Sequence, residues 1–143
     1  MNSRFRSRYQ ALVSASLLLW CLVAGIAGYW LAVAAGHGVS SDAAYMSCAV
    51  VFPPADTALG FAAAAAAELL RRGRPAAVLA GLLTAGALGF LGIADVTINL
   101  RFGIYDRGAG SSLAWELFVN AFSLVFAVWL ADFCWRHRRA LGA

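Results

Sequence analysis

Long apolar stretches alternate with short polar ones along the whole chain. Four stretches, residues 11–35, 54–70, 75–98 and 113–135, consist almost entirely of apolar side chains. An α-helix of about 20 such residues crosses a hydrocarbon core of about 30 Å. Because the connections are short, we predict that four membrane-spanning helices pack as one antiparallel all-α bundle formed by residues 1–143.

Proline and glycine mark the expected helix ends. Pro53 and Pro54 stand at the start of the second stretch, and Pro75 stands at the start of the third. Proline suits the first turn of a helix because its missing N–H has no intrahelical partner there. Gly73 lies between the second and third stretches, where glycine commonly follows a helix. The pattern predicts a tight turn between these two helices.

The first stretch also has features of a secretory signal. Arginines precede it, and Ala32-Val33-Ala34 matches an Ala-x-Ala cleavage pattern. The apolar core of a signal peptide has about 7–15 residues, and this stretch is longer. We therefore expect an uncleaved first helix.

Small residues recur at every fourth position of each stretch, as in Ala24, Gly28 and Ala32. Helices in lipid pack closely where such residues let their backbones approach, so we expect these stripes at helix contacts. The alanine run at residues 62–67 suits a central helix contacted on several faces, and a bias of the composition toward alanine is the alternative explanation. Aromatic residues of the fourth stretch suit lipid or a partner protein: Phe118, Phe122, Phe126, Trp129 and Phe133.

The overall composition agrees with a membrane protein. Hydrophobic residues make up 62% of the chain and charged residues only 13%, whereas soluble domains average about one quarter charged. The net charge of +4 comes from arginines beside the apolar stretches rather than along one polar face. The expected partner is therefore the lipid bilayer, and no nucleic acid is expected.

Arginine positions predict the orientation of the chain in the membrane. Nine precede the first helix, join the second to the third, or follow the fourth: Arg4, Arg6, Arg8, Arg71, Arg72, Arg74, Arg136, Arg138 and Arg139. Only Arg101 and Arg107 fall on the opposite side. The positive-inside rule then predicts a multi-pass plasma-membrane protein with both termini cytoplasmic, and Trp30 and Trp115 fit an aromatic belt. The layout resembles that of many small bacterial four-span proteins.

Acids and amides gather at the predicted outer ends of the helices. In LGIADVTINLR, residues 91–101, Asp95 and Asn99 lie one turn apart on one helix face. A charge at the centre of a spanning helix costs roughly 2.5–3.5 kcal/mol, and such residues usually face other helices or water. Glu116 and Asn120 repeat this spacing. We predict a polar site with three catalytic acids, Asp95, Glu116 and Asp56, and with ligand-binding groups Asn99, Asn120, Arg101 and Tyr105.

Structural roles compete with this hypothesis. Asp56 and Glu116 fall near the expected helix starts, where the helix dipole favours acids. Asp95 would gain from an ion pair with Arg101 or from a hydrogen bond to a neighbouring helix. His37, in the first outer connection, is a further candidate neighbour of the site, although a lone loop histidine is more often solvated.

Other polar residues indicate structure rather than chemistry. Glu68 precedes Arg71 and Arg72 by one turn, and Asp132 precedes Arg136, so we expect local ion pairs there. No metal-ligand spacing, phosphate loop or dinucleotide motif is present, and we expect neither metal nor cofactor. The three cysteines form no Cys-x-x-Cys pair and are expected to pack as small apolar residues.

Three functions fit these features. The first is a site for a lipid-like or isoprenoid molecule, with acid/base isomerisation or cyclisation as the reaction if the protein is an enzyme. The second is an accessory subunit that steadies a membrane complex. The third is an oligomeric transporter coupled to protons or cations. Against it, none of the four predicted spans has the break at its midpoint that is common in transporters. The sequence favours the first and leaves open whether a reaction occurs.

Overall fold

The computed structural model describes residues 3–36, 45, 47–48, 50–106 and 111–142, and the side chains among them except those of 3–8, 111 and 112. In these residues, four long α-helices account for nearly all of the chain: α1 (Ser3–Ala34), α3 (Phe52–Arg71), α4 (Ala76–Arg101) and α5 (Ser111–His137). A 3₁₀ turn, η1 (Arg138–Ala140), follows α5. The described chain is therefore all-helical, as predicted.

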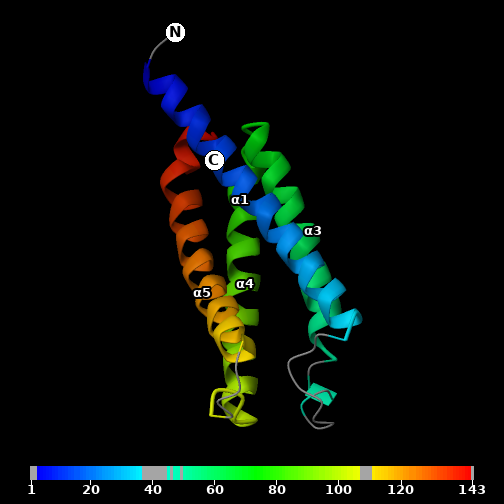
Figure 1. Cartoon of the computed structure of the whole chain (residues 1–143). Coiled ribbons are helices and arrows are strands. Elements are labelled where there is room, and N and C mark those ends of the chain that lie inside the picture. Colours follow the sequence, from blue (N-terminus) through cyan, green and yellow to red (C-terminus); the bar gives the residue numbers. More distant parts are fainter. Residues whose placement is uncertain (1–2, 37–44, 46, 49, 107–110, 143) are drawn as a thin grey trace.

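The helices pack in the order α1, α3, α4, α5, each against the next along the chain. Figure 1 shows neighbouring helices running antiparallel, with the start of α1, the α3–α4 turn and the end of α5 at one end. We call this the arginine end, and the opposite one, where α1 and α4 finish, the loop end. Toward the loop end α1 diverges from α5, so the two outer helices form a V with α3 and α4 behind it (Figure 1).

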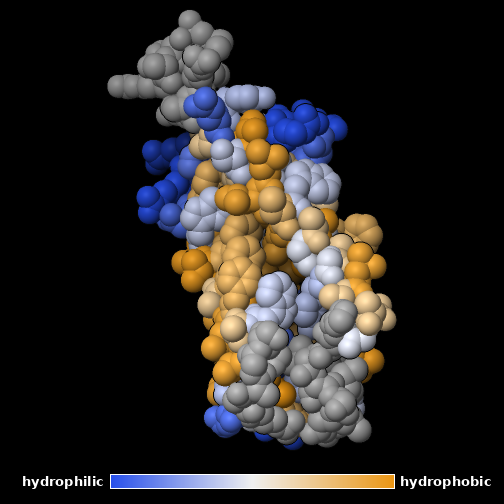
Figure 2. All heavy atoms as spheres, in the orientation of Figure 1, coloured by the Kyte–Doolittle hydropathy of each residue, from blue (hydrophilic) through white to orange (hydrophobic). Residues whose placement is uncertain are grey.

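Three helices are long and apolar enough to cross a membrane: Tyr9–Ala34 in α1, Ala76–Arg101 in α4 and Leu113–Ala140 across α5 and η1. Large apolar side chains such as Phe61, Phe90 and Val128 are exposed on the outside of the bundle, as in a protein surrounded by lipid. Figure 2 shows this apolar surface at mid-height, with hydrophilic side chains at the arginine end.

Helix α3 does not meet the same criterion, so the prediction of four spans holds for three of the four helices by length and apolarity. Its sequence explains the difference, because α3 consists largely of alanine and carries Asp56, Glu68 and two prolines. The prolines occupy the start of the helix, and Gly73 turns the chain after it with a φ of +61°. Both features were predicted from the sequence.

The alanine run gives α3 its central position. Ala63, Ala66 and Ala67 are completely buried, and α3 contacts both α1 and α4. A run of methyl side chains lets two helices approach α3 closely. The prediction of a central helix contacted on several faces is confirmed.

Small residues also bring α4 and α5 together. A Cβ at Gly81 would overlap the Cys134 sulfur, and one at Gly92 would lie 3.2 Å from Ser123 Cβ. The stripe predicted on α1 behaves differently, because Ala24, Gly28 and Ala32 are exposed. At Gly28, no atom of the described residues lies within 4 Å of the position that a Cβ would take. The expectation is therefore wrong for α1 at these positions, and the buried side chains of this helix are instead those of Ala15, Ser16, Leu19 and Leu22.

The expected ion pairs form at the arginine end. Glu68 accepts hydrogen bonds from Arg71 and Arg72, and Asp132 accepts one of 2.8 Å from Arg136. All these pairs are local to one helix and largely exposed. They confirm the structural role predicted for these acids.

Candidate functional site

A cavity of about 500 Å³ is lined by residues of α1 and α5, together with residues of α3 and α4. All four helices contribute to it, and its walls are mainly apolar, with Leu22 and Ile26 from α1, Leu88 from α4 and Phe122 from α5. Its size falls within the range of about 300–1,000 Å³ typical of small-molecule sites. Asp56, Asp95 and Glu116 also line it, so the three predicted acids do meet at one site.

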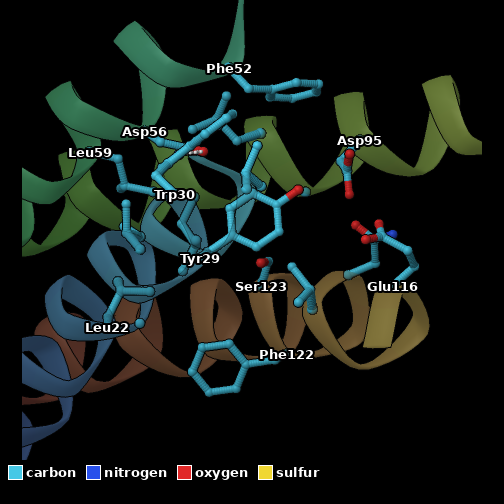
Figure 3. Close-up of a pocket in the computed structure, with 18 of the residues that line it drawn as sticks. Leu22, Tyr29, Trp30, Phe52, Asp56, Leu59, Asp95, Glu116, Phe122 and Ser123 are labelled. Carbon is cyan, nitrogen blue, oxygen red and sulfur yellow. Dashed lines mark hydrogen bonds between the residues drawn. The ribbon is translucent and has the colours of Figure 1, made fainter. Parts of the chain in front are cut away.

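Two of these acids share one amide. Asn99 Nδ2 donates a hydrogen bond of 3.1 Å to Glu116 Oε2 and makes a longer contact of 3.4 Å with Asp95 Oδ2. Asn99 is fully buried behind the cavity, and Glu116 is only 3% exposed. The i, i+4 spacing of Asp95 and Asn99 thus places both on the α4 face that meets α5. Figure 3 shows the Asp95 and Glu116 carboxyl groups on the same side of the cavity.

The second amide supports the same end of the cavity. Asn120, also lining the cavity, donates a hydrogen bond of 2.7 Å to the Tyr105 hydroxyl, which follows α4. Tyr45 lines the cavity as well, and its ring meets that of Phe102 edge-on at 5.8 Å. Burial, and next the charge of Glu116, raise the pKa of Tyr45 above its usual range. The phenol therefore stays protonated at neutral pH and remains a hydrogen-bond donor.

Asp56 lies apart from the other two acids. Its Oδ2 accepts a hydrogen bond of 2.9 Å from the Trp30 indole N–H of α1. The Tyr29 ring projects between Asp56 on one side and Asp95 and Glu116 on the other (Figure 3). The Tyr29 hydroxyl forms no hydrogen bond with any residue that the structure describes. The cavity thus has an acid on each side of a phenol that is free to bind a ligand.

The structure excludes two of the alternative roles. Helix α3 begins at Phe52 and α5 at Ser111, so neither Asp56 nor Glu116 lies in the first turn of its helix, and the helix-dipole explanation is wrong. Arg101 is exposed at the end of α4, does not line the cavity and forms no ion pair with Asp95, a residue that is likewise described. The hydrogen-bonding alternative for Asp95 remains, through Asn99.

Some predicted positions are outside the site. Arg101, expected to bind ligand, is too far along α4 to line the cavity. His37 and Arg107 lie outside the described residues. Among the residues that the structure describes, no group of three or more metal-binding side chains is present.

Sequence reasoning missed the contribution of α1. Tyr29 was not singled out, and Trp30 was assigned to an aromatic belt, yet both line the cavity. A signal was present, because Leu22, Ile26, Tyr29 and Val33 recur at helical spacing on one face of α1. The α1 face that lines the cavity therefore carries large residues, whereas the sequence pattern predicted contacts for the stripe of small residues on another face.

The arrangement can hold an elongated apolar molecule with a polar group at one end. Apolar walls exclude water, while the carboxyl groups, Asn120 and the Tyr29 hydroxyl supply hydrogen-bonding partners. Comparison of the chain with protein-family models, curated proteins and solved structures finds no match. The site therefore has to be interpreted from its own geometry.

Proposed function

We propose that this protein binds an amphiphilic small molecule, such as a single-chain lipid or an isoprenoid, in the cavity between α1 and α5. The observation that carries the proposal is the distribution of polarity in this space of about 500 Å³. Its apolar walls suit a hydrocarbon chain, and its three carboxyl groups and Asn120 suit a polar head group. If these acids served only to hold the helices together, no cavity would be needed beside them.

The proposal places all four helices in the membrane. Helix α3 has 20 residues, about 30 Å of helix, and lies between α1 and α4, which are apolar enough to span. Neighbouring helices shield much of α3 from lipid, so its modest hydropathy is tolerated. With the arginine end cytoplasmic in a plasma membrane, the cavity opens in the outer half of the bilayer.

The V between α1 and α5 supplies the entry route. These helices do not pack closely against each other along their length, whereas α4 and α5 do. The two helices diverge toward the loop end (Figure 1), and in a bilayer the open side of this V would face lipid tails. An amphiphile already dissolved in the outer leaflet would enter sideways, keeping its chain in an apolar environment throughout.

A matched pair of glycines on α1 tests the proposal. No atom of the described residues lies within 4 Å of the position that a Cβ would take at Gly25 or at Gly28, but of the two only Gly25 lines the cavity. Phenylalanine at either position therefore adds the same side chain, to the cavity in Gly25→Phe and to the outer surface in Gly28→Phe. Wild type and both variants are purified in mild detergent, and copurifying small molecules are identified by mass spectrometry.

We expect an amphiphile with the wild type and with Gly28→Phe, and at least about tenfold less with Gly25→Phe, a loss of roughly 1.4 kcal/mol of binding free energy. Equal amounts in all three proteins, or none in the wild type, would contradict the proposal. A stoichiometric protein partner retained by all three, without an amphiphile, would favour the accessory-subunit hypothesis instead.

Chemical conversion of the bound molecule is a separate prediction. Asp95 and Glu116 lie on one side of the cavity and Asp56 on the other, so a proton donor and an acceptor would flank a ligand between them. Isomerisation or cyclisation needs such a pair. Incubating the copurified molecule with protein and following its mass and retention time would detect turnover, and Asp95→Asn should abolish it without reducing protein abundance.

A further inference from the structure

The cavity is lined by acids without any basic side chain among its described residues. Asp56, Asp95 and Glu116 line it, and no arginine, lysine or histidine is among the described residues that do so. Asp95 and Glu116 are close enough to share one amide nitrogen. Placing two carboxylates together away from water is unfavourable unless a cation or hydrogen-bond donors compensate them.

The donors in the described part of the chain do not fully compensate these groups. Glu116 Oε1 is buried and has no hydrogen-bond partner among the residues that the structure describes, and Glu116 as a whole is only 3% exposed. The Asn99 amide nitrogen already contacts the other Glu116 oxygen and one Asp95 oxygen. Because an amide NH₂ group has two N–H donors, it cannot supply a third hydrogen bond. Buried polar atoms are nearly always paired, and a buried acceptor without a donor indicates a missing partner.

The missing partner has to donate hydrogen bonds and carry positive charge. A protonated primary amine does both, because an ammonium group has three N–H donors and no acceptor. A phosphate head group would bring negative charge toward three acids. A hydroxyl group supplies one donor but leaves the charge unbalanced, and hydrogen bonds to charged groups are about twice as strong as neutral ones.

We propose that the ligand is an amine-bearing amphiphile, in which a single apolar chain lies along the cavity and its ammonium group binds between Asp95 and Glu116. This inference rests on the proposed amphiphile-binding function and names its ligand class. Tyr29 and Asn120 line the cavity beside the acids and offer further polar contacts to the head group.

Three ligands with the same chain separate the alternatives: hexadecylamine, hexadecanol and hexadecyl phosphate. Each is added at the same mole fraction to nanodiscs of phosphatidylcholine containing the wild-type protein, and binding is measured by native mass spectrometry. We expect the amine to bind about tenfold more tightly than the alcohol, the ratio expected when a charged hydrogen bond replaces a neutral one, and the phosphate more weakly than either.

Asp95→Asn and Glu116→Gln keep the shape of each side chain and remove its charge. In each variant the preference for amine over alcohol should fall about tenfold. Asp132→Asn is the matched control, since it removes one carboxylate from the exposed surface of the arginine end and should keep the preference.

The outcomes separate this inference from the proposed function. If the alcohol binds as tightly as the amine, or if both variants keep the amine preference, the amine assignment is overturned while amphiphile binding stands. If none of the three ligands binds the wild type, the proposed function itself fails.

Discussion

Acidic residues have different surroundings at the two ends of the molecule. At the arginine end, Glu68 and Asp132 are partly exposed, and each pairs with an arginine of its own helix. Toward the loop end, Asp95 and Glu116 lie between helices and share the amide donor of Asn99. Acids at the arginine end are neutralised locally, whereas those near the loop end depend on the tertiary fold.

This difference distinguishes exposed acids, which only form ion pairs on the surface, from buried acids that line a candidate site. An ion pair within one helix forms wherever the spacing is right and contributes little in water. A pair of carboxyl groups buried against a cavity is costly, so the rest of the fold or a ligand has to compensate it. The comparison predicts that equal substitutions at the two ends have unequal consequences.

The largest effect is expected for Asn99→Leu. The variant removes the amide donor shared by Asp95 and Glu116 and leaves their buried oxygens without it. Losing the partner of buried charged groups should reduce the free energy of unfolding by about 3 kcal/mol. Thermal unfolding of the purified protein in detergent, followed by circular dichroism, measures the change.

Asn120→Leu is the matched comparison for Asn99→Leu. It makes the same replacement, but the bond lost is to the neutral Tyr105 hydroxyl. The expected loss is about 1 kcal/mol, the usual contribution of a neutral hydrogen bond. Equal losses in the two variants would mean that Asn99 does not compensate buried charge, and the contrast between the ends would disappear.

The sequence predicts the contacts within one helix and only some of the contacts between helices. Helix ends, the turn at Gly73, and the pairing of Glu68 with Arg71 follow from spacings within one segment. The shared face of Asp95 and Asn99 follows in the same way. Which residues of α5 meet that face depends on how the helices are rotated about their axes, and spacing along one helix does not determine this.

Two pairings illustrate that limit. Glu116 and Asn120 share the spacing of Asp95 and Asn99, yet Glu116 bonds to Asn99 of α4, and Asn120 to Tyr105 beyond it. Trp30 looks like an interfacial anchor in the sequence, and only the approach of α3 to α1 brings Asp56 to its indole N–H. Both bonds join separate segments, which is why a pattern within one segment did not reveal them.

An effect that is confined to high pH is expected from the phenol near the acids. Burial raises the pKa of Tyr45 in the folded protein, whereas the unfolded chain titrates near pH 10. The unfolded state therefore loses this proton first as the pH rises. Stability from Tyr45 is fully present below about pH 10 and falls above it by up to about 1.4 kcal/mol per pH unit, until the folded protein also ionises.

Tyr45→Phe removes this dependence. Melting temperatures measured from pH 8 to 11 should fall less steeply above pH 10 in the variant than in the wild type. Parallel curves for the two proteins would show that the surroundings of Tyr45 do not disfavour its ionised form, and that folding does not raise its pKa.

The smallest effect is expected for Asp132→Asn at the arginine end. Its ion pair with Arg136 is exposed, with the arginine side chain 73% and the aspartate side chain 49% accessible. Such pairs contribute at most about 1 kcal/mol, and salt screens them. The melting temperature should therefore change little at low ionic strength and not at all in 0.5 M salt. A loss as large as that of Asn99→Leu would show that the arginine end, rather than the polar contacts beside the cavity, holds the helices together.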